Sequence, residues 1–207
     1  YHGCIPTKED GTFDDVYIDG QYLSGWKYLK QVEDKVRKAF YCEVGSEEQL
    51  NALDYCWYLW SGPKSPLFGK NKMTTFERYF IEDKATHKEH YNPYYYHIES
   101  RDYCKSILKE FDLDINKSHI VNGHVPVKTH KGESPIKGGG ILLVIDGGLS
   151  KAYHKSTGIG GYTLISNSNM MIIAEHRPFV EVVDSGFKIS PKITVVERFN
   201  KRVTVGE

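Results

Sequence analysis

The chain has 207 residues, which is enough for one large domain or two small ones with a substantial core. Hydrophobic residues make up 40% of it and charged residues 26%, and the 27 basic and 27 acidic side chains give a formal net charge of zero. This balance offers no electrostatic argument for binding nucleic acid or an anionic membrane, so we expect neither as a partner. No apolar run approaches the roughly 20 residues that span a bilayer.

One hairpin and a series of helices are predicted for the first half of the chain. The segment "VYIDGQYL" is typical of a hairpin, with Asp19 and Gly20 in its turn. Ser24 is predicted to cap a helix that runs to about Phe40. The apolar residues that recur at helical spacing within it are Trp26, Leu29, Val32, Val36 and Phe40.

Two capping boxes predict further helix starts, because the first and fourth side chains of each can bond to free N–H groups. The boxes run from Ser46 to Gln49 and from Thr74 to Glu77. A last helix is predicted from Ser100 to Phe111. The helix after the first box ends at Gly62 and carries one apolar stripe, formed by Leu50, Leu53, Trp57 and Trp60.

The second half reads mainly as strands. The segment "SHIVNGHV" predicts a strand that ends in a turn, and "ILLVID" predicts a strand covered on both faces. Two hairpins should follow, one turning at residues 167–169 and one near Asn200. The sequence therefore predicts an α/β (α+β) protein, mainly helical over residues 1–115 and mainly strands over residues 116–207. We expect this boundary to mark a change from helical to strand-rich structure and not to separate independent domains.

The histidine of "NGHVP" is a candidate metal ligand. His124 follows a predicted strand, and Gly123 before it would let the backbone bend tightly. Strand ends of this kind hold ligands and catalytic groups in α/β enzymes, and a neutral imidazole suits Zn, Mn or Fe. The alternative is a turn histidine that makes only backbone hydrogen bonds.

A second histidine, His2 in "YHGCIP", has the same pattern of an apolar lead-in, glycine and proline. Two such turns suggest neighbouring strand ends whose histidines share one metal. A catalytic metal usually needs three or more protein ligands, so two histidines would be an incomplete set. His87 and His90 are spaced three apart, which fits a metal pair on a helix but is more often a solvated surface.

The segment "KTHKGESPIKGGG" is rich in lysine and glycine and holds Lys128, Lys131 and Lys137. Such a loop can bind phosphate through N–H groups and charge, although it matches no P-loop. The alternative is a surface loop without a ligand. Asp146, at the end of "VIDGG", is either a functional carboxylate or part of an Asp-Gly turn that closes the strand.

The four cysteines show no spacing of a zinc ribbon or a C-x-x-C motif. Their small number in a chain of this length argues against a disulfide scaffold, so we expect free thiols in a reducing cytoplasm. The chain starts at Tyr1, within a segment that reads as the interior of a domain. We therefore expect it to be part of a longer protein.

Several long segments together resemble the C-terminal part of a class III fructose-1,6-bisphosphatase of the Firmicutes type. They are "HGCIP", "LWSGPKSPLFGKNKMTTFERYF", "NGHVPVKTHKGESPIKGGG" and "DGGLSKAYHKSTGIGGYTL", and the resemblance spans nearly the whole chain. It implies the calcineurin-like metallophosphoesterase superfamily, with a β-sandwich of two mixed sheets flanked by helices. It also implies hydrolysis of fructose 1,6-bisphosphate in gluconeogenesis.

The superfamily binds two metals through D-x-H, G-D-x-x and G-N-H motifs, a later histidine and a last G-H motif. This sequence holds only the last two elements, so the resemblance implies His2 and His124 as ligands of the second metal and Mn²⁺ as the metal. Pro126 stands where many members have another histidine. The nucleophile would be a hydroxide held between the two metals.

Basic side chains near these motifs are candidates for binding the anionic ends of a sugar bisphosphate substrate. Charge and loop setting select Lys128, Lys137 and Lys64.

With the first metal's ligands missing, we expect the chain alone to be inactive. Two other functions stay open. One is a different metallophosphoesterase, such as a protein phosphatase or a nuclease. The other is a non-catalytic binding or assembly module, for which the tyrosine-rich "HYNPYYYH" gives some support. The sequence also allows a homo-oligomer.

Overall fold

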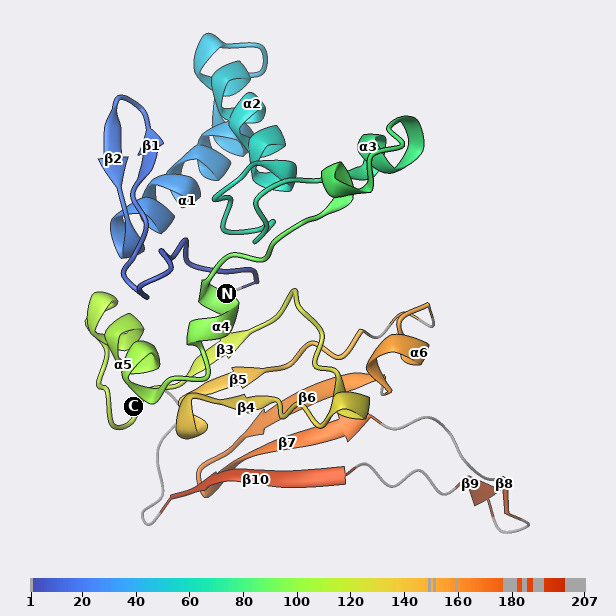
Figure 1. Cartoon of the computed structure of the whole chain (residues 1–207). Helices are drawn as coiled ribbons and strands as arrows, with labels where there is room; N and C mark the ends of the chain where they lie inside the picture. The colour runs from blue at the N-terminus through green and yellow to red at the C-terminus, as the bar shows by residue number, and fades with distance from the viewer. Residues whose placement is uncertain are drawn as a thin grey trace. The chain divides into compact units, whose positions relative to one another are not determined.

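The computed structural model describes residues 2–148, 150, 152–158, 160–176 and 192–199, and the backbone of residues 182–183 and 186–187. The chain divides into two compact units, Tyr1–Ser118 and His119–Glu207. Most helices lie in the first unit and most strands in the second (Figure 1). The predicted mixed α/β class, with a helical first half and a strand-rich second half, is therefore confirmed.

The first unit begins with a two-stranded hairpin and continues with helices joined by loops. Its elements are β1 (Val16–Ile18), β2 (Gln21–Leu23), α1 (Gly25–Tyr41), α2 (Glu47–Ser61), α3 (Thr75–Phe80), the 3₁₀ turn η1 (Lys84–His87), α4 (Tyr94–His97) and α5 (Arg101–Glu110).

The predicted hairpin is confirmed, because β1 pairs with β2 in antiparallel register. Asp19 and Gly20, between the strands, have φ angles of 48° and 81°. Two successive left-handed residues are typical of the tight turn that matches the twist of a β-hairpin. Val16 and Ile18 point from this hairpin into the core of the first unit.

The predicted helix α1 is confirmed, but only part of the predicted stripe is buried. Tyr28 and Val32 are buried in the core shared with the hairpin and α2. A tyrosine ring can be buried as a large apolar body when its hydroxyl is bonded, and the Tyr28 hydroxyl lies 3.1 Å from that of Tyr55. Members of the predicted stripe that are instead exposed are Trp26, Val36 and Phe40.

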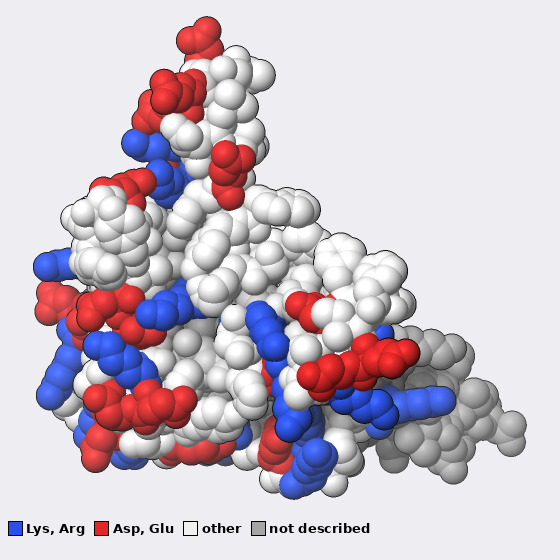
Figure 2. Space-filling model, turned by 45° about the horizontal axis from the view of Figure 1, so that its top comes forward, with Lys and Arg blue, Asp and Glu red and all other residues white. Residues whose placement is uncertain are grey.

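Helix α2 presents its predicted apolar stripe to the outside of the described structure. The helix buries Ala52 and Leu59. The stripe residues are between 46% and 69% exposed, and they are Leu50, Leu53, Trp57 and Trp60. Elsewhere the surface is mixed in charge, with basic and acidic side chains next to one another on the face that Figure 2 shows.

Only one of the two predicted capping boxes forms a cap. The Ser46 side chain accepts a hydrogen bond from the N–H of Gln49, which confirms the start of α2. Thr74 precedes α3 but makes no cap bond. Its hydroxyl instead donates to the carboxylate of Glu89 at 2.9 Å and accepts from Nε of Arg78 at 3.0 Å, so the second box is wrong because other partners hold the side chain.

The second unit consists mainly of short strands. Its elements are β3 (Ile120–Asn122), η2 (Thr129–Lys131), β4 (Ile136–Lys137), η3 (Gly138–Gly140), β5 (Leu142–Val144), α6 (His154–Thr157), β6 (Gly161–Ser166), β7 (Met170–His176), β8 (Val182–Val183), β9 (Gly186–Phe187) and β10 (Lys192–Arg198).

Two three-stranded sheets make up most of this unit (Figure 1). In the first, β3 pairs with β5 in parallel and β4 pairs with β5 in antiparallel register. Strand β5 is buried along its whole length, as the apolar run "ILLVID" predicts. The second sheet has the order β10-β7-β6, with both pairs antiparallel.

The hairpin predicted to turn at residues 167–169 is confirmed as β6 and β7. The side chain of Asn167 accepts bonds from the N–H groups of Asn169 and Met170 and so closes the turn. Strand β10 pairs with β7, and the partner predicted for it, residues 201–207, lies outside the described residues. Within the described part of the chain, no helix is long and apolar enough to cross a membrane.

Candidate functional site

The candidate site is built around the carboxyl ends of two neighbouring parallel strands. Asn122 ends β3 opposite Val144, which ends β5. Because the strands are parallel, the loops that follow them leave the same edge of the sheet. The N–H of Ile145 donates to the Asn122 carbonyl at 2.9 Å, and the N–H of Val127 donates to the Asp146 carbonyl at 2.9 Å. These two bonds fix the loop of His124 beside the loop of Asp146.

His124 has a φ angle of 71°, in the left-handed region that side chains with a Cβ rarely adopt. The N–H of Val125 donates to the Gly123 carbonyl at 2.9 Å and closes a tight turn around the histidine. The sequence suggested that Gly123 supplies the bend, but the left-handed residue is His124. Such strain costs about 1–2 kcal/mol and tends to occur at functional sites.

Asp146 forms a turn with its own backbone. Its Oδ1 atom accepts a hydrogen bond from the N–H of Gly148 at 2.9 Å. This is the arrangement expected of an aspartate that closes a strand, which was one of the two alternatives for this residue. One carboxylate oxygen is thus engaged in holding the loop beside His124.

His2 lies in the first unit, in a segment anchored to the loop at residues 65–66. The N–H of Cys4 donates to the Pro66 carbonyl at 2.8 Å, and the Cys4 thiol is buried. A Cβ atom on Gly3 would lie 2.0 Å from the Pro66 carbonyl oxygen, so only glycine fits beside His2. His2 and His124 belong to different units, and their sharing of one metal stays a prediction.

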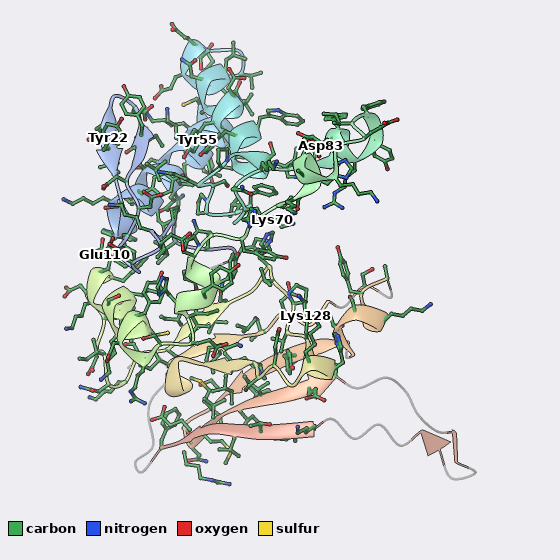
Figure 3. All side chains as sticks on the ribbon, viewed as in Figure 1. Tyr22, Tyr55, Lys70, Asp83, Glu110 and Lys128 are labelled. Carbon is green, nitrogen blue, oxygen red and sulfur yellow. The ribbon has the colours of Figure 1, made fainter. Side chains whose placement is uncertain are left out.

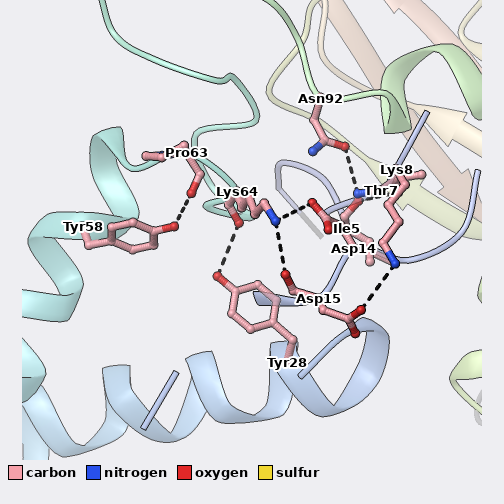
Figure 4. A network of polar contacts seen from close by, with 10 residues as sticks. All are labelled: Ile5, Thr7, Lys8, Asp14, Asp15, Tyr28, Tyr58, Pro63, Lys64 and Asn92. Atoms are coloured by element: carbon pink, nitrogen blue, oxygen red, sulfur yellow. Dashed lines mark hydrogen bonds and ion pairs between the residues drawn. The ribbon is translucent and has the colours of Figure 1, made fainter. Parts of the chain in front are cut away.

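The side chain of Lys64 is engaged within the first unit (Figure 4). Its Nζ atom lies 2.9 Å from Oδ2 of Asp14 and donates to the Asp15 carbonyl at 3.2 Å. Lys64 also has a left-handed backbone, with a φ of 63°, and its carbonyl accepts a bond from Tyr28. To bind a substrate, this ammonium group would have to leave Asp14.

The other two candidate lysines lie in the second unit, Lys128 on the loop that follows β3 and Lys137 in β4. Lys128, labelled in Figure 3, donates its backbone N–H to Oε2 of Glu133 at 2.9 Å. Lys137 ends β4, and the glycines after it have φ angles of 54°, 61° and 97°. A run of left-handed glycines explains the triple glycine, since no other residue adopts this conformation repeatedly.

Side chains that could bind metal do not form a complete set. Among the residues that the structure describes, no three histidine, cysteine, aspartate or glutamate side chains gather closely enough to hold an ion. His87 and His90 do not share a helix, because His87 closes a 3₁₀ turn and bonds the Ile81 carbonyl, while His90 lies outside a helix. The cysteines are free thiols, as predicted.

Sequence reasoning missed the strain at His124, the capture of Lys64 by Asp14 and the carboxylate of Glu89. The pKa of Glu89 falls to about 2, since burial would raise it but bonds from Lys70 and Thr74 outweigh that effect. All three depend on contacts between residues distant in sequence or on backbone angles. The only local signal was the dipeptide Asn-Gly before His124, which marks a turn.

Comparisons with known proteins agree on one family. The model of the Firmicute fructose-1,6-bisphosphatase family matches residues 1–207. A class 3 fructose-1,6-bisphosphatase of Clostridium botulinum (strain Kyoto / Type A2) is 48% identical over 99% of this chain and 31% of the relative. A class 3 enzyme of Clostridium novyi (strain NT) is 53% identical over 88% of this chain and 27% of the relative. The chain thus spans less than a third of the length of these relatives. No solved structure matches it.

Proposed function

The chain belongs to the Firmicute fructose-1,6-bisphosphatase family, and from this membership we propose that it serves the hydrolysis of fructose 1,6-bisphosphate to fructose 6-phosphate and phosphate. The reaction would belong to gluconeogenesis in the cytoplasm. The proposal concerns the assembled enzyme, because the chain covers 31% of the length of the Clostridium botulinum relative. Alone, the chain should be inactive.

The observation that carries this proposal is His124 at the end of β3. A non-glycine residue in left-handed conformation, fixed beside the end of a buried parallel strand, has the position expected of a functional group. Hydrogen bonds between the two loops hold the histidine in place. Strain of this kind has no evident structural benefit, since glycine or asparagine would form the turn more easily.

A metal ion fits these residues only in part. The imidazole of His124 can supply one ligand, whereas a catalytic metal usually takes three or more from the protein. The described residues contain no further group of ligands. We therefore propose that His124, with His2, completes a Mn²⁺ site. Its other ligands would come from the part of the enzyme that this chain does not cover, since the chain aligns with only 31% of the Clostridium botulinum relative. A metal pair, when bound, would neutralise charge on the substrate phosphate.

Two of the three lysines remain the better candidates for the sugar bisphosphate. Lys128 and Lys137 lie on the loop and strand that follow His124 in the second unit. Their ammonium groups would attract the anionic ends of the substrate and would neutralise charge during phosphoryl transfer. Lys64 would act in the same way only after breaking its ion pair with Asp14.

A chimera tests the proposal. The matching part of the Clostridium botulinum enzyme is replaced by this chain, and phosphate release from fructose 1,6-bisphosphate is measured with Mn²⁺. We expect the chimera to be active, and we expect His124→Ala to lower kcat/KM by at least about a hundredfold, as loss of a catalytic ligand would. The control is His130→Ala, an exposed residue on the same loop. A folded but inactive chimera, or an unaffected His124→Ala variant, would contradict the proposal.

A second candidate function is a non-catalytic assembly module. The exposed stripe of α2 favours it, because apolar residues aligned on one helix face usually pack against another surface. The last two residues of the stripe, Trp57 and Trp60, have ring centroids 5.1 Å apart. Under this reading the His124→Ala chimera would keep its activity, and Trp57→Ala would disturb assembly instead. Sedimentation velocity of the isolated chain also tests whether it forms a homo-oligomer.

A further inference from the structure

The second unit contains a cavity of about 430 Å³, a size in the range of small-molecule sites. One face of the sheet β10-β7-β6 forms its floor, and the loop from Thr129 to Ile136 forms its wall. Neither His124 nor any of the three candidate lysines lines it. The cavity is therefore lined by other residues than His124 and these lysines.

A row of three polar side chains crosses the floor of this cavity. Tyr162 on β6 pairs with Glu175 on β7, and Glu175 pairs with Lys192 on β10. Directly paired residues of neighbouring strands point to the same face of a sheet. The next row on that face contributes Ile173 and Thr194, which gives the floor one apolar patch and one hydroxyl.

The hydroxyl of Tyr162 is the unexplained group of this cavity. The residue is 8% exposed, and its buried hydroxyl has no hydrogen-bond partner among the residues that the structure describes. A buried polar group without a partner costs about 1–3 kcal/mol. Tyr162 lines the cavity, so a molecule bound there can supply the missing partner.

The charges around Tyr162 restrict what that partner can be. Burial, followed by the negative charges of Glu175 and Glu133, raises the pKa of Tyr162 to about 12, so its hydroxyl stays protonated at neutral pH. The two carboxylates accept hydrogen bonds and the ammonium of Lys192 donates them. A ligand has to offer donors and acceptors together. Two carboxylates and one ammonium group give the cavity a net negative charge, which disfavours binding of a phosphate.

We propose that this cavity binds a small, uncharged, hydroxyl-rich molecule of the sugar or polyol class, positioned by the Tyr162 hydroxyl and the two glutamates. Each ligand hydroxyl can donate to a carboxylate and accept from Lys192 or Thr194, and the apolar side of the molecule can lie on Ile173. The proposal does not rest on phosphatase activity. It assigns a second function to the loop in which the sequence suggested a phosphate site, because Glu133 of that loop lines the cavity.

The test is a titration of the ¹⁵N-labelled chain with sorbitol, with D-glucose and, as an anionic probe, with inorganic phosphate. We expect sorbitol or glucose to shift the amide signals of Tyr162, Glu175 and Thr194, and we expect phosphate to leave them in place. Tyr162→Phe should weaken the binding about three- to tenfold, the effect of losing one buried hydrogen bond. Tyr153→Phe is the control, because Tyr153 is 55% exposed and does not line the cavity.

A second variant keeps the test valid if Tyr162→Phe alters the sheet. Glu133 is exposed and lies on the loop, so Glu133→Gln should preserve the fold while removing one negative charge. It should make phosphate bind severalfold more tightly at the same signals. Absence of shifts with both sorbitol and glucose would mean that only water fills the cavity, and would overturn the proposal. Equal binding by Tyr162→Phe, or preferential binding of phosphate to the unaltered chain, would overturn it too.

Discussion

The ammonium group of Lys70 lies 2.7 Å from the carboxylate of Glu89 and joins two loops that flank α3. The other oxygen of Glu89 accepts bonds from the N–H and the hydroxyl of Thr74, each at 2.9 Å. Lys70 also lies 5.3 Å from the ring centroid of Tyr91, within the range of a cation–π contact. Glu89 thus holds the segments before and after α3 together.

This arrangement predicts a stability that depends on acid pH. The pKa of Glu89 in the folded chain is lowered from 4.5 to about 2, so the carboxylate stabilises the fold fully above pH 4.5 and loses this contribution as the pH falls toward 2. Glu89→Gln should therefore lower the free energy of unfolding by about 1–2 kcal/mol at pH 7, allowing for screening by solvent. The difference from the unaltered chain should shrink at pH 3. Urea denaturation at both pH values measures it.

An exposed glutamate on another loop provides the control for this measurement. Glu43→Gln should change the free energy of unfolding by less than about 0.5 kcal/mol at either pH, as is usual for surface substitutions. A Glu89→Gln variant whose loss of stability is the same at pH 7 and pH 3 would show that the carboxylate acts by packing and not by charge.

The two serines that precede α1 and α2 should differ in their effects on stability. The Ser46 side chain caps α2 through the N–H of Gln49, whereas Ser24 stands at the start of α1 without a side-chain cap bond. Ser46→Ala should lower the free energy of unfolding by about 1 kcal/mol, and Ser24→Ala by distinctly less. Thermal unfolding followed by circular dichroism compares the two. Equal losses would mean that the observed cap bond contributes nothing.

Local sequence patterns predicted where helices and strands lie in the chain better than they predicted which face of each element is buried. The turn at Asp19 and Gly20 and the apolar run of β5 are determined by residues adjacent in sequence, and both are confirmed. The buried face of α1 was predicted only in part, because Val32 is buried as expected but Tyr28, outside the predicted stripe, is buried too and contacts Tyr55 from another helix. The cap expected at Thr74 failed for the same reason.

The candidate site shows the same limit. The sequence placed His124 at the end of a strand, and the structure agrees. It could not reveal that Lys64 is paired with Asp14, since the two residues are brought together only by the fold. The cavity beneath Glu133 was also hidden, because its floor depends on the register of three strands. A candidate group whose position depends on one turn can be predicted from the local sequence. A contact or cavity formed by elements distant in sequence cannot.

A methyl group at Gly3 should be poorly tolerated. Its Cβ atom would meet the backbone carbonyl of Pro66 at 2.0 Å, and a backbone atom cannot move away as a flexible side chain can. Gly3→Ala should therefore break the bond between Cys4 and Pro66 and lower the free energy of unfolding by more than about 2 kcal/mol. In Gly45→Ala nothing lies within 4 Å, and only the left-handed backbone is strained, at a cost of about 1 kcal/mol. Similar losses in both variants would contradict the close approach.

The backbone of His124 predicts a trade between stability and function. Because its φ of 71° is unfavourable for a side chain with a Cβ, His124→Gly should raise the free energy of unfolding by about 0.5–1 kcal/mol. His130→Gly is the control: it is exposed on the same loop without a positive φ, so glycine there should be neutral or destabilising. Urea denaturation of the three chains gives these differences.

The same His124→Gly substitution in the chimera should abolish hydrolysis of fructose 1,6-bisphosphate if the imidazole binds metal. A variant that is more stable and inactive would show that the strain at His124 is kept for function. If His124 served only the turn, glycine would increase the stability and leave the activity unchanged. A more stable chimera with full activity would instead identify His124 as a turn residue. A less stable chain would show that the imidazole makes contacts that outweigh the strain, and the left-handed backbone would then carry no functional meaning.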